Sequence, residues 1–201
     1  MRFHDITHDD MLNGDGLRVV LWVAGCNHHC PGCQNPQTWD PEGGIEFTVW
    51  EEAEFYDWLS KDWTKGATFS GGDPLFPSNR AKIFSMMRYI KEKWPEKDIW
   101  IYTGYVVGYD SEGFNITGPD AEGLKVPELE LADVIIDSKF DMKVREKDLA
   151  ENKNILWRGS SNQRIIDVKE TKANSSLTFR DVDGEEKIQQ QVVSDCCSCC
   201  S

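Results

Sequence analysis

The sequence has no long hydrophobic run and no excess of basic residues. None of its apolar stretches approaches the roughly 18–20 residues that a membrane-spanning helix requires. The formal net charge is -13, and no basic patch interrupts the acidic excess, so a polyanionic nucleic acid would be repelled. The first ten residues lack the basic start and the apolar middle of a secretory signal. The sequence therefore predicts a cytoplasmic protein that binds neither nucleic acid nor a membrane.

Cysteine is missing from most of the chain. Seven cysteines are present, but none lies between Cys33 and Cys196. Three of them lie close together near the N-terminus, and the other four lie within the last six residues. An odd number of cysteines in a reducing compartment argues against a framework of disulfides. This uneven distribution favours metal or cluster chemistry.

Short apolar runs and amphipathic segments alternate along the chain between these two groups of cysteines. Runs rich in β-branched and aromatic residues are typical of strands in a parallel sheet. The predicted strands are Leu17–Ala24, Ala67–Ser70, Asp98–Thr103, Val134–Asp137 and Ile155–Trp157. Helical spacing of apolar residues and a capping box of Thr48 with Glu51 predict helices over Thr48–Leu59 and Asn79–Trp94. Between these elements we expect a loop over Gly25–Gly44 and a surface excursion over Gly108–Pro127.

Alternating strands and helices predict βαβ units, and hence an α/β fold with a parallel sheet. A complete eight-stranded barrel takes about 250 residues, and this 201-residue chain has too few strand–helix pairs. We therefore expect a partial, open β/α barrel over residues 1–166. Its ligands would lie at the carboxyl ends of the strands, where Cys26, Gly71 and Lys139 fall. A C-terminal extension would follow, with a hairpin-like segment over residues 167–193 and a disordered Cys-rich tail over residues 194–201.

Cys26, Cys30 and Cys33 follow the first predicted strand with spacers of three and two residues. Thiolates are soft ligands that suit iron–sulfur clusters and zinc. Three ligands on one short loop leave a fourth coordination position open, which is typical of a reactive centre. A structural zinc site completed by His28, by His29 or by the tail cysteines is the alternative that the spacing leaves open.

This cysteine spacing is the signature of the radical S-adenosylmethionine superfamily. Other motifs make the chain resemble one family of glycyl-radical-enzyme activases, the activating proteins of anaerobic ribonucleoside-triphosphate reductase. The resemblance extends from Met1 to about Gln163, and it departs at Gln34, where many relatives carry an aromatic residue. Beyond the cysteines, its motifs lie at Asn13–Arg18, Gly71–Leu75, Lys97–Trp100, Thr103–Tyr105, Ile136–Phe140 and Trp157–Gln163.

The resemblance implies an oxidoreductase with two cofactors. Cys26, Cys30 and Cys33 would hold a [4Fe–4S] cluster, and S-adenosyl-L-methionine would bind beside it. An electron from a donor such as flavodoxin would cleave S-adenosylmethionine reductively. The resulting 5′-deoxyadenosyl radical would take a hydrogen atom from a glycine of the large subunit of the anaerobic ribonucleoside-triphosphate reductase. The implied cofactor-binding residues are Gly32, Cys33, Gln34, Gly71, Gly72, Asp73, Asp137 and Lys139.

The residues themselves give reasons for two of these contacts. Glycine permits a ligand to approach the backbone closely, so the Gly71–Gly72 turn with the negative charge of Asp73 suits the amino group of the cofactor. Asp137 and Lys139 alternate with Ser138 at the end of a strand, which predicts that they point to the same face. Lys139 would then pair with the cofactor carboxylate, or form a surface salt bridge. Thr103 would join Asp137 in a cation site.

Two alternative functions remain beside the reductase activator. One is an activase of another glycyl radical enzyme, or a radical enzyme that acts on a small molecule. The other is a non-enzymatic zinc or electron-transfer module. The Trp157–Gln163 motif favours the reductase activator over the first alternative. The four cysteines of the tail are predicted to be dispensable, because adjacent cysteines ligate one ion awkwardly.

Overall fold

The computed structural model describes residues 1–180 and residue 182 of the chain. Its strands are β1 (Arg2–Asp10), β2 (Arg18–Val23), β3 (Ile45–Glu46), β4 (Gly66–Gly71), β5 (Asp98–Tyr102), β6 (Val106–Asp110), β7 (Gly113–Gly118), β8 (Ala121–Lys125), β9 (Val134–Asp137) and β10 (Arg164–Asp167). Its helices are α1 (Val49–Leu59), α2 (Arg80–Lys93), α3 (Met142–Ala150) and α4 (Val168–Asn174), with short 3-10 helices η1 (Pro36–Thr38) and η2 (Pro127–Leu131). None of the helices in this part of the chain combines the length and the apolar character that crossing a bilayer requires.

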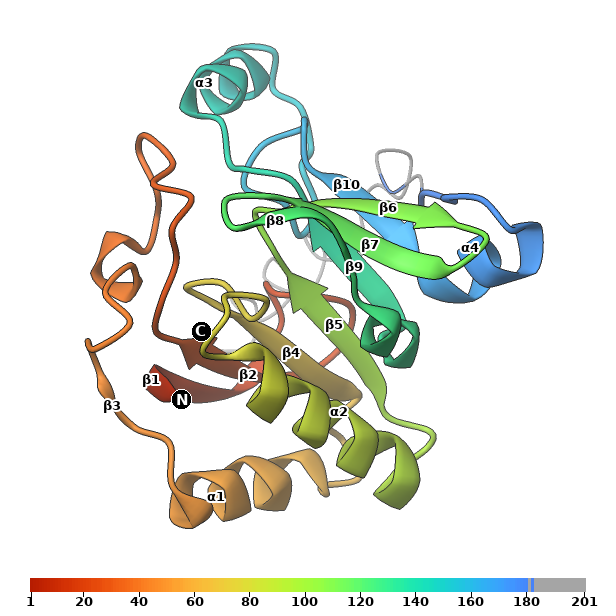
Figure 1. Ribbon diagram of the computed structural model, residues 1–201. Helices are drawn as coiled ribbons and strands as arrows, with labels where there is room; N and C mark the ends of the chain where they lie inside the picture. The colour runs from red at the N-terminus through yellow and green to blue at the C-terminus, as the bar shows by residue number, and fades with distance from the viewer. Residues whose placement is uncertain (181, 183–201) are drawn as a thin grey trace, which may run out of the picture.

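A mixed seven-stranded sheet forms the centre of the molecule, in the order β10-β9-β5-β4-β2-β1-β3 (Figure 1). Its four middle strands, β2, β4, β5 and β9, run parallel to one another. These are four of the five predicted strands, and their existence is confirmed. Because parallel strands end at the same edge of a sheet, the segments that follow them meet there. A second sheet, β6-β7-β8, is antiparallel and belongs to the same hydrophobic core.

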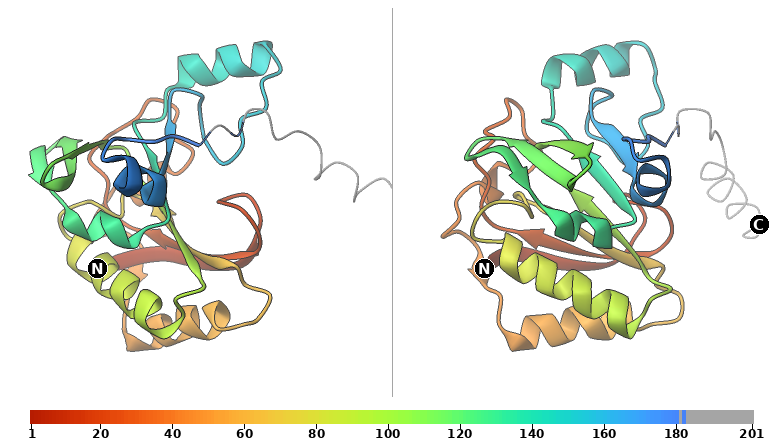
Figure 2. Two further views of the ribbon diagram at one scale, coloured as in Figure 1. Left: turned by 90° about the vertical axis from the view of Figure 1, so that its right-hand side faces the viewer. Right: turned by 45° about the vertical axis from the view of Figure 1, so that its right-hand side comes forward.

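Helices α1 and α2 cover one face of the large sheet, and both were predicted from the sequence. Figure 2 shows them side by side along that face. The start of α1 is fixed by the predicted capping box, in which the Thr48 hydroxyl accepts from the amide of Trp50 at 3.2 Å and the Glu51 carboxylate accepts from the amide of Thr48 at 2.8 Å. Alternate strand residues such as Leu21 and Phe69 are fully buried against these helices.

The predicted partial, open β/α barrel is wrong. The strand–helix repeat occurs with α1 and α2 and then stops, because the connection from β5 to β9 is the β6-β7-β8 sheet with η2. Antiparallel strands flank the parallel centre, with β1 on β2 and β10 on β9. A barrel of this type needs every strand parallel and every crossover helical. The described chain instead forms a mixed, sheet-rich α/β structure.

Other differences have local causes. No strand forms at Ile155–Trp157, and the last strand among the described residues is β10, which is antiparallel to β9. The Gly- and Asp-rich excursion predicted over Gly108–Pro127 is mostly sheet, because its glycines lie within or at the ends of β6, β7 and β8 and only two-residue turns separate these strands. Part of the predicted hairpin segment forms α4. The rest of that hairpin, including Asp183 and Gly184, and the Cys-rich tail lie outside the described residues.

A buried arginine joins the loop between β1 and β2 to the sheet. The guanidinium of Arg18 is fully buried, and it donates to the Thr68 hydroxyl at 2.7 Å and pairs with Asp98 at 2.6 Å. The same Thr68 hydroxyl donates to the carbonyl of Asn13 at 2.8 Å. A charge in the protein interior is stable only when it is paired and hydrogen-bonded in this way. Arg18 thereby holds the β1–β2 loop at a fixed position over the sheet.

Candidate functional site

A pocket of about 560 Å³ opens where the parallel strands end. Its floor includes Trp22 of β2, Ser70 of β4 and Tyr102 of β5. These side chains alternate along their strands with residues of the core under α1 and α2, so the pocket lies on the opposite face of the sheet. The segments after β2 and β4 meet at this edge of the sheet, and the binding of a ligand by their residues stays a prediction.

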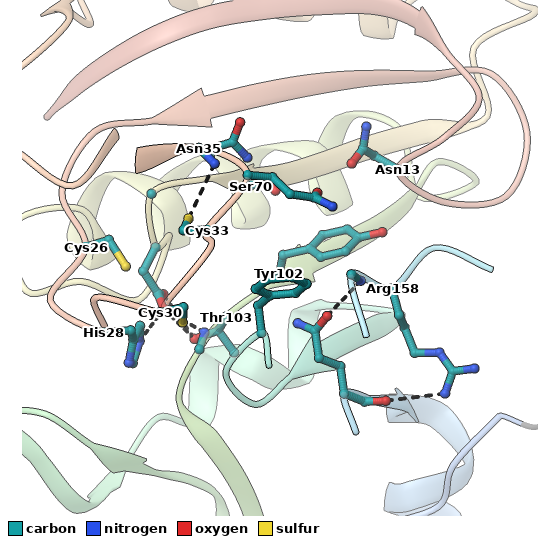
Figure 3. A pocket seen from close by; sticks show the side chains of 18 of the residues that line it. Asn13, Cys26, His28, Cys30, Cys33, Asn35, Ser70, Tyr102, Thr103 and Arg158 are labelled. Carbon is teal, nitrogen blue, oxygen red and sulfur yellow. Dashed lines mark hydrogen bonds and ion pairs between the residues drawn. The ribbon is translucent and has the colours of Figure 1, made fainter. Parts of the chain in front are cut away.

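All three N-terminal cysteines line this pocket, and none of them is in a disulfide. Figure 3 shows Cys26, Cys30 and Cys33 together at one side of it, on the loop that follows β2. Cys30 is buried, whereas Cys26 and Cys33 are half-buried. Burial, followed by the nearby charge of Asp73, raises the pKa of the Cys26 thiol to about 12, and burial also raises the pKa of Cys30. These two thiols stay protonated at neutral pH until a cation replaces the proton.

The cysteine loop is held by backbone hydrogen bonds to its own return segment. The amide of Gly25 donates to the carbonyl of Thr38 at 2.7 Å, and the amide of Cys26 donates to the carbonyl of Trp39 at 3.0 Å. The sulfur of Cys33 accepts from the amide of Asn35 at 3.4 Å. The backbone of the loop is therefore held by these hydrogen bonds, although it contains no strand in this stretch.

The predicted Gly-Gly turn also lines the pocket. Gly71 ends β4 with φ +100, and a Cβ added there would lie 2.7 Å from the backbone of Trp22 and Val23. The amide of Gly72 donates to the carbonyl of Val23 at 2.8 Å. Only glycine combines this left-handed conformation with so close an approach of two strands. The turn consequently presents bare backbone to a ligand in the pocket.

Asp73 lines the pocket but is almost completely buried, with 1% exposure. Its carboxylate accepts hydrogen bonds from the amide of Leu75 at 2.8 Å and the amide of Gly104 at 2.8 Å. The hydroxyl of Thr103 lies 3.0 Å from both carboxylate oxygens, and Nε2 of His28 lies 2.7 Å from one of them. Thr103 therefore pairs with Asp73 and not, as predicted, with Asp137. The carboxylate of Asp73 is engaged by the protein itself.

His28 was considered in the sequence only as a zinc ligand. The structure directs its Nε2 to Asp73 and not to the thiols. Within residues 1–180 and 182, no three His, Cys, Asp or Glu side chains are arranged around a single ion position. The thiolates of an iron–sulfur cluster bind separate irons and need not converge on one point. Three separate soft donors facing one pocket therefore fit a cluster.

Asp137 and Lys139 do not share a face. Strand β9 ends at Asp137, and Ser138 adopts φ +78, which interrupts the alternation on which the prediction depended. Asp137 is fully buried, accepts from the amide of Val107 at 2.8 Å and pairs with Arg164 of β10, whose Nε lies 2.9 Å away. Its carboxylate is used within the fold, and Asp137 does not line the pocket.

Lys139 and Gly32 lie beside the pocket, and Gln34 lies in it. Lys139 is exposed, lines a neighbouring cavity of about 580 Å³, and places its Nζ 3.4 Å from the carbonyl of His28. Gly32 packs against Met142 of α3. Gln34 lines the pocket next to Cys33, and its contact with the cofactor stays a prediction. The loop after β2 and the turn after β4 thus come together at the pocket. After β9, Ser138 and Phe140 line the pocket, whereas Asp137 and Lys139 do not.

The side of the pocket opposite the cysteines was not predicted. It is formed by residues 155–159, in which Trp157 adopts φ +57 and packs edge-on against Trp100 at 5.0 Å. The hydroxyl of Tyr102 donates to the carbonyl of Trp157 at 2.7 Å, and burial raises the pKa of Tyr102, which keeps that proton in place. The Trp157–Gln163 motif marked part of this segment as characteristic of the family. Nothing in the sequence indicated that the segment forms a side of the pocket.

Comparisons with known proteins agree with this geometry. A protein-family model described as a 4Fe-4S single cluster domain matches residues 12–166. The chain is 42% identical over 165 residues to the anaerobic ribonucleoside-triphosphate reductase-activating protein of Enterobacteria phage T4, covering 82% of this chain and 93% of that protein. The proteins of that name from Escherichia coli K12 and Pasteurella multocida are 34% identical over 167 residues and 37% identical over 158 residues. These alignments cover 82% and 78% of this chain, and 97% and 90% of the respective relatives.

Proposed function

This chain belongs to the family of anaerobic ribonucleoside-triphosphate reductase-activating proteins, with their 4Fe–4S single-cluster domain, and on that premise we propose that it activates such a reductase by reductive cleavage of S-adenosylmethionine at a [4Fe–4S] cluster. The product would be a glycyl radical on the reductase. The observation that carries this proposal is the gathering of Cys26, Cys30 and Cys33 with the Gly71–Gly72 turn in one open pocket.

The three cysteines are the residues that would hold the cluster. Three thiolates on a four-iron cluster leave one iron without a protein ligand, which is where a second cofactor binds. When bound, the cluster supplies the electron that cleaves S-adenosylmethionine. The protein contributes three donors on an ordered loop and a pocket of about 560 Å³ beside them, a volume in the ordinary range for a small-molecule site.

The remaining pocket residues would bind and shield S-adenosylmethionine. The Gly71–Gly72 turn lets the amino group of the cofactor approach the backbone, and Gln34 adjoins the cysteines. Trp22, Tyr102 and Trp157 give the pocket aromatic walls. Such walls exclude water from a reactive intermediate, and a one-electron donor such as flavodoxin would act from outside.

The function is tested by forming the radical on the partner. The reduced protein, S-adenosylmethionine and the cognate reductase are mixed without oxygen, and electron paramagnetic resonance is recorded. We expect a doublet from a glycyl radical, because the proposed substrate is a protein glycine. The control is a reductase in which the acceptor glycine is replaced by Ala, which should give no doublet. Formation of 5′-deoxyadenosine without any radical on the reductase would contradict the partner assignment.

Two exposed apolar side chains at the pocket suggest where the reductase docks. Met11 and Leu12 lie on the loop between β1 and β2, line the pocket, and are 52% and 78% exposed. Leu12→Asp is expected to reduce glycyl-radical formation about tenfold, equivalent to about 1.4 kcal/mol of docking energy. Cleavage of S-adenosylmethionine is measured in parallel without the reductase, because Leu12 also lines the cofactor pocket, and the radical yield is compared at equal cleavage.

The matched control for this docking variant is Leu149→Asp on α3. Leu149 is 59% exposed and does not line the pocket, so the same change in charge and hydrophobicity should leave radical formation intact. Both rates are measured from the radical signal per reductase at a fixed time. Equal radical yields from the two variants would place the docking surface elsewhere.

A further inference from the structure

The cysteine loop and the Gly-Gly turn are joined by one buried carboxylate. The amide of Asp73 donates to the carbonyl of Gly25 at 2.8 Å, directly before Cys26. Its carboxylate accepts from His28, which lies between Cys26 and Cys30. The residues proposed to hold the cluster and the turn proposed to hold S-adenosylmethionine are therefore connected through Asp73.

Asp73 also gathers the segment after β5. Thr103 and Gly104 follow that strand, and both donate to the Asp73 carboxylate. Asp73, Thr103 and His28 are exposed by only 1%, 5% and 6%. A buried carboxylate is stable when several donors satisfy it, and hydrogen bonds to an ionised group are stronger than those between neutral groups. Among these donors, His28 supplies the side chain that comes from the cysteine loop.

The ring of His28 is fixed on several sides. Its Nδ1 is buried and finds no hydrogen-bond partner among residues 1–180 and 182. A proton on Nδ1 would therefore lack an acceptor, so the proton lies on Nε2, which donates to Asp73. The ring meets Tyr105 edge-on at 4.6 Å. A Cβ added to Gly104 would lie 2.4 Å from the Cδ2 of His28, so the ring rests directly on that backbone.

We propose that His28 is a positioning residue whose bond to Asp73 sets the cysteine loop against the Gly71–Gly72 turn. This inference rests on the proposed function, because it concerns how cluster and S-adenosylmethionine meet. His28 donates none of the three thiolates, so its loss leaves the cluster ligands intact. Its loss leaves only the backbone bond from Asp73 to Gly25 between the turn and the loop, so the part of the loop around His28 can shift. A displacement of about 1 Å between reacting groups is enough to slow a reaction about 100-fold.

The test compares His28→Leu with His28→Gln. Leu removes the donor to Asp73, whereas the Gln amide restores an N–H donor on a flexible side chain. We expect His28→Leu to keep the iron and sulfide content of the wild type while its kcat for S-adenosylmethionine cleavage falls about 10- to 100-fold. The electron paramagnetic resonance spectrum of the reduced cluster should respond less to added S-adenosylmethionine. His28→Gln should recover much of both. His8→Leu, a change on the exposed part of β1, is the control and should match the wild type.

Gly104→Ala gives a second, independent probe. The added methyl group displaces the His28 ring, so this variant should reproduce the phenotype of His28→Leu. The double variant Gly104→Ala with His28→Ala should lose less kcat for S-adenosylmethionine cleavage than the two single variants together. The reason is that the small alanine side chain at position 28 removes the clash with the methyl group at position 104.

The outcomes separate this inference from the proposed function. If the wild-type protein cleaves no S-adenosylmethionine, the proposed function fails. If the wild type is active and His28→Leu matches it in kcat and in the spectral response, the inference is overturned and the function stands. The inference is also overturned if three results occur together: His28→Leu loses the cluster, His28→Gln recovers nothing, and the effects of the His28 and Gly104 changes are purely additive. In that case His28 would serve only folding.

Discussion

Replacing any one of Cys26, Cys30 and Cys33 by Ala is expected to remove most of the bound iron and to reduce S-adenosylmethionine cleavage at least about 100-fold. Loss of an outer-shell partner of a metal ligand already costs about 10- to 100-fold, and here a ligand itself is lost. The three thiols line one pocket on an ordered loop, and the described residues place no other cysteine beside them. The measurement is iron and sulfide content, visible absorption and 5′-deoxyadenosine formation after anaerobic reconstitution.

The matched control for these variants uses the cysteines at the other end of the sequence. Cys196, Cys197, Cys199 and Cys200 are replaced together by Ser, or the chain is truncated before Cys196. Cluster content and cleavage should remain at the level of the wild type. If a variant of Cys26, Cys30 or Cys33 keeps a full cluster and normal cleavage, the replaced cysteine is not a cluster ligand. Loss of bound metal and activity from the tail variant would implicate the tail.

Gly71→Ala is expected to lower the free energy of unfolding by about 3 kcal/mol and to weaken cofactor binding. Part of this loss, about 1–2 kcal/mol, comes from placing a side chain at φ +100. The rest comes from the added Cβ, which would lie 2.7 Å from the backbone of Trp22 and Val23. Because Gly71 joins β4 to the pocket turn, the strands must separate at the edge where the cofactor binds.

Gly123→Ala is the control that separates these two causes. Gly123 in β8 also has a positive φ of +63, but a Cβ added there meets nothing within 4 Å. Its replacement should therefore cost only the conformational part, about 1–2 kcal/mol. Urea unfolding followed by circular dichroism gives both free energies. Equal losses for the two variants would contradict the close approach of β2 and β4 at Gly71.

Local sequence signals predicted the elements that bear the pocket. The continuous apolar run at Leu17–Ala24 became β2, and the capping box at Thr48 became the start of α1. Strand β1 was not predicted, because Arg2–Asp10 is mostly polar and only Phe3 in it is buried. A strand of that composition is stabilised by pairing with β2 and not by its own apolar pattern.

The barrel prediction failed because strand direction is not a local property. The apolar runs that became β9 and β10 are short and similar, but β9 runs parallel to β5 whereas β10 returns antiparallel to β9. The prediction for Asp137 and Lys139 failed for a related reason. It assumed that β9 continues past Asp137, whereas Ser138 takes a left-handed conformation as the chain turns toward α3. Periodicity gives no information once a strand ends.

The sequence by itself determined the spacing of Cys26, Cys30 and Cys33 and the strand that precedes them. Consecutive residues set both, because chain connectivity keeps three near neighbours on one loop in any fold. Only the tertiary structure decided which side chains complete the site. His28 meets Asp73 across 45 positions of sequence, and Asp137 meets Arg164 and not the pocket. Such partners depend on how loops pack at a shared sheet edge, and no local rule fixes which of several buried polar groups lies within hydrogen-bonding distance.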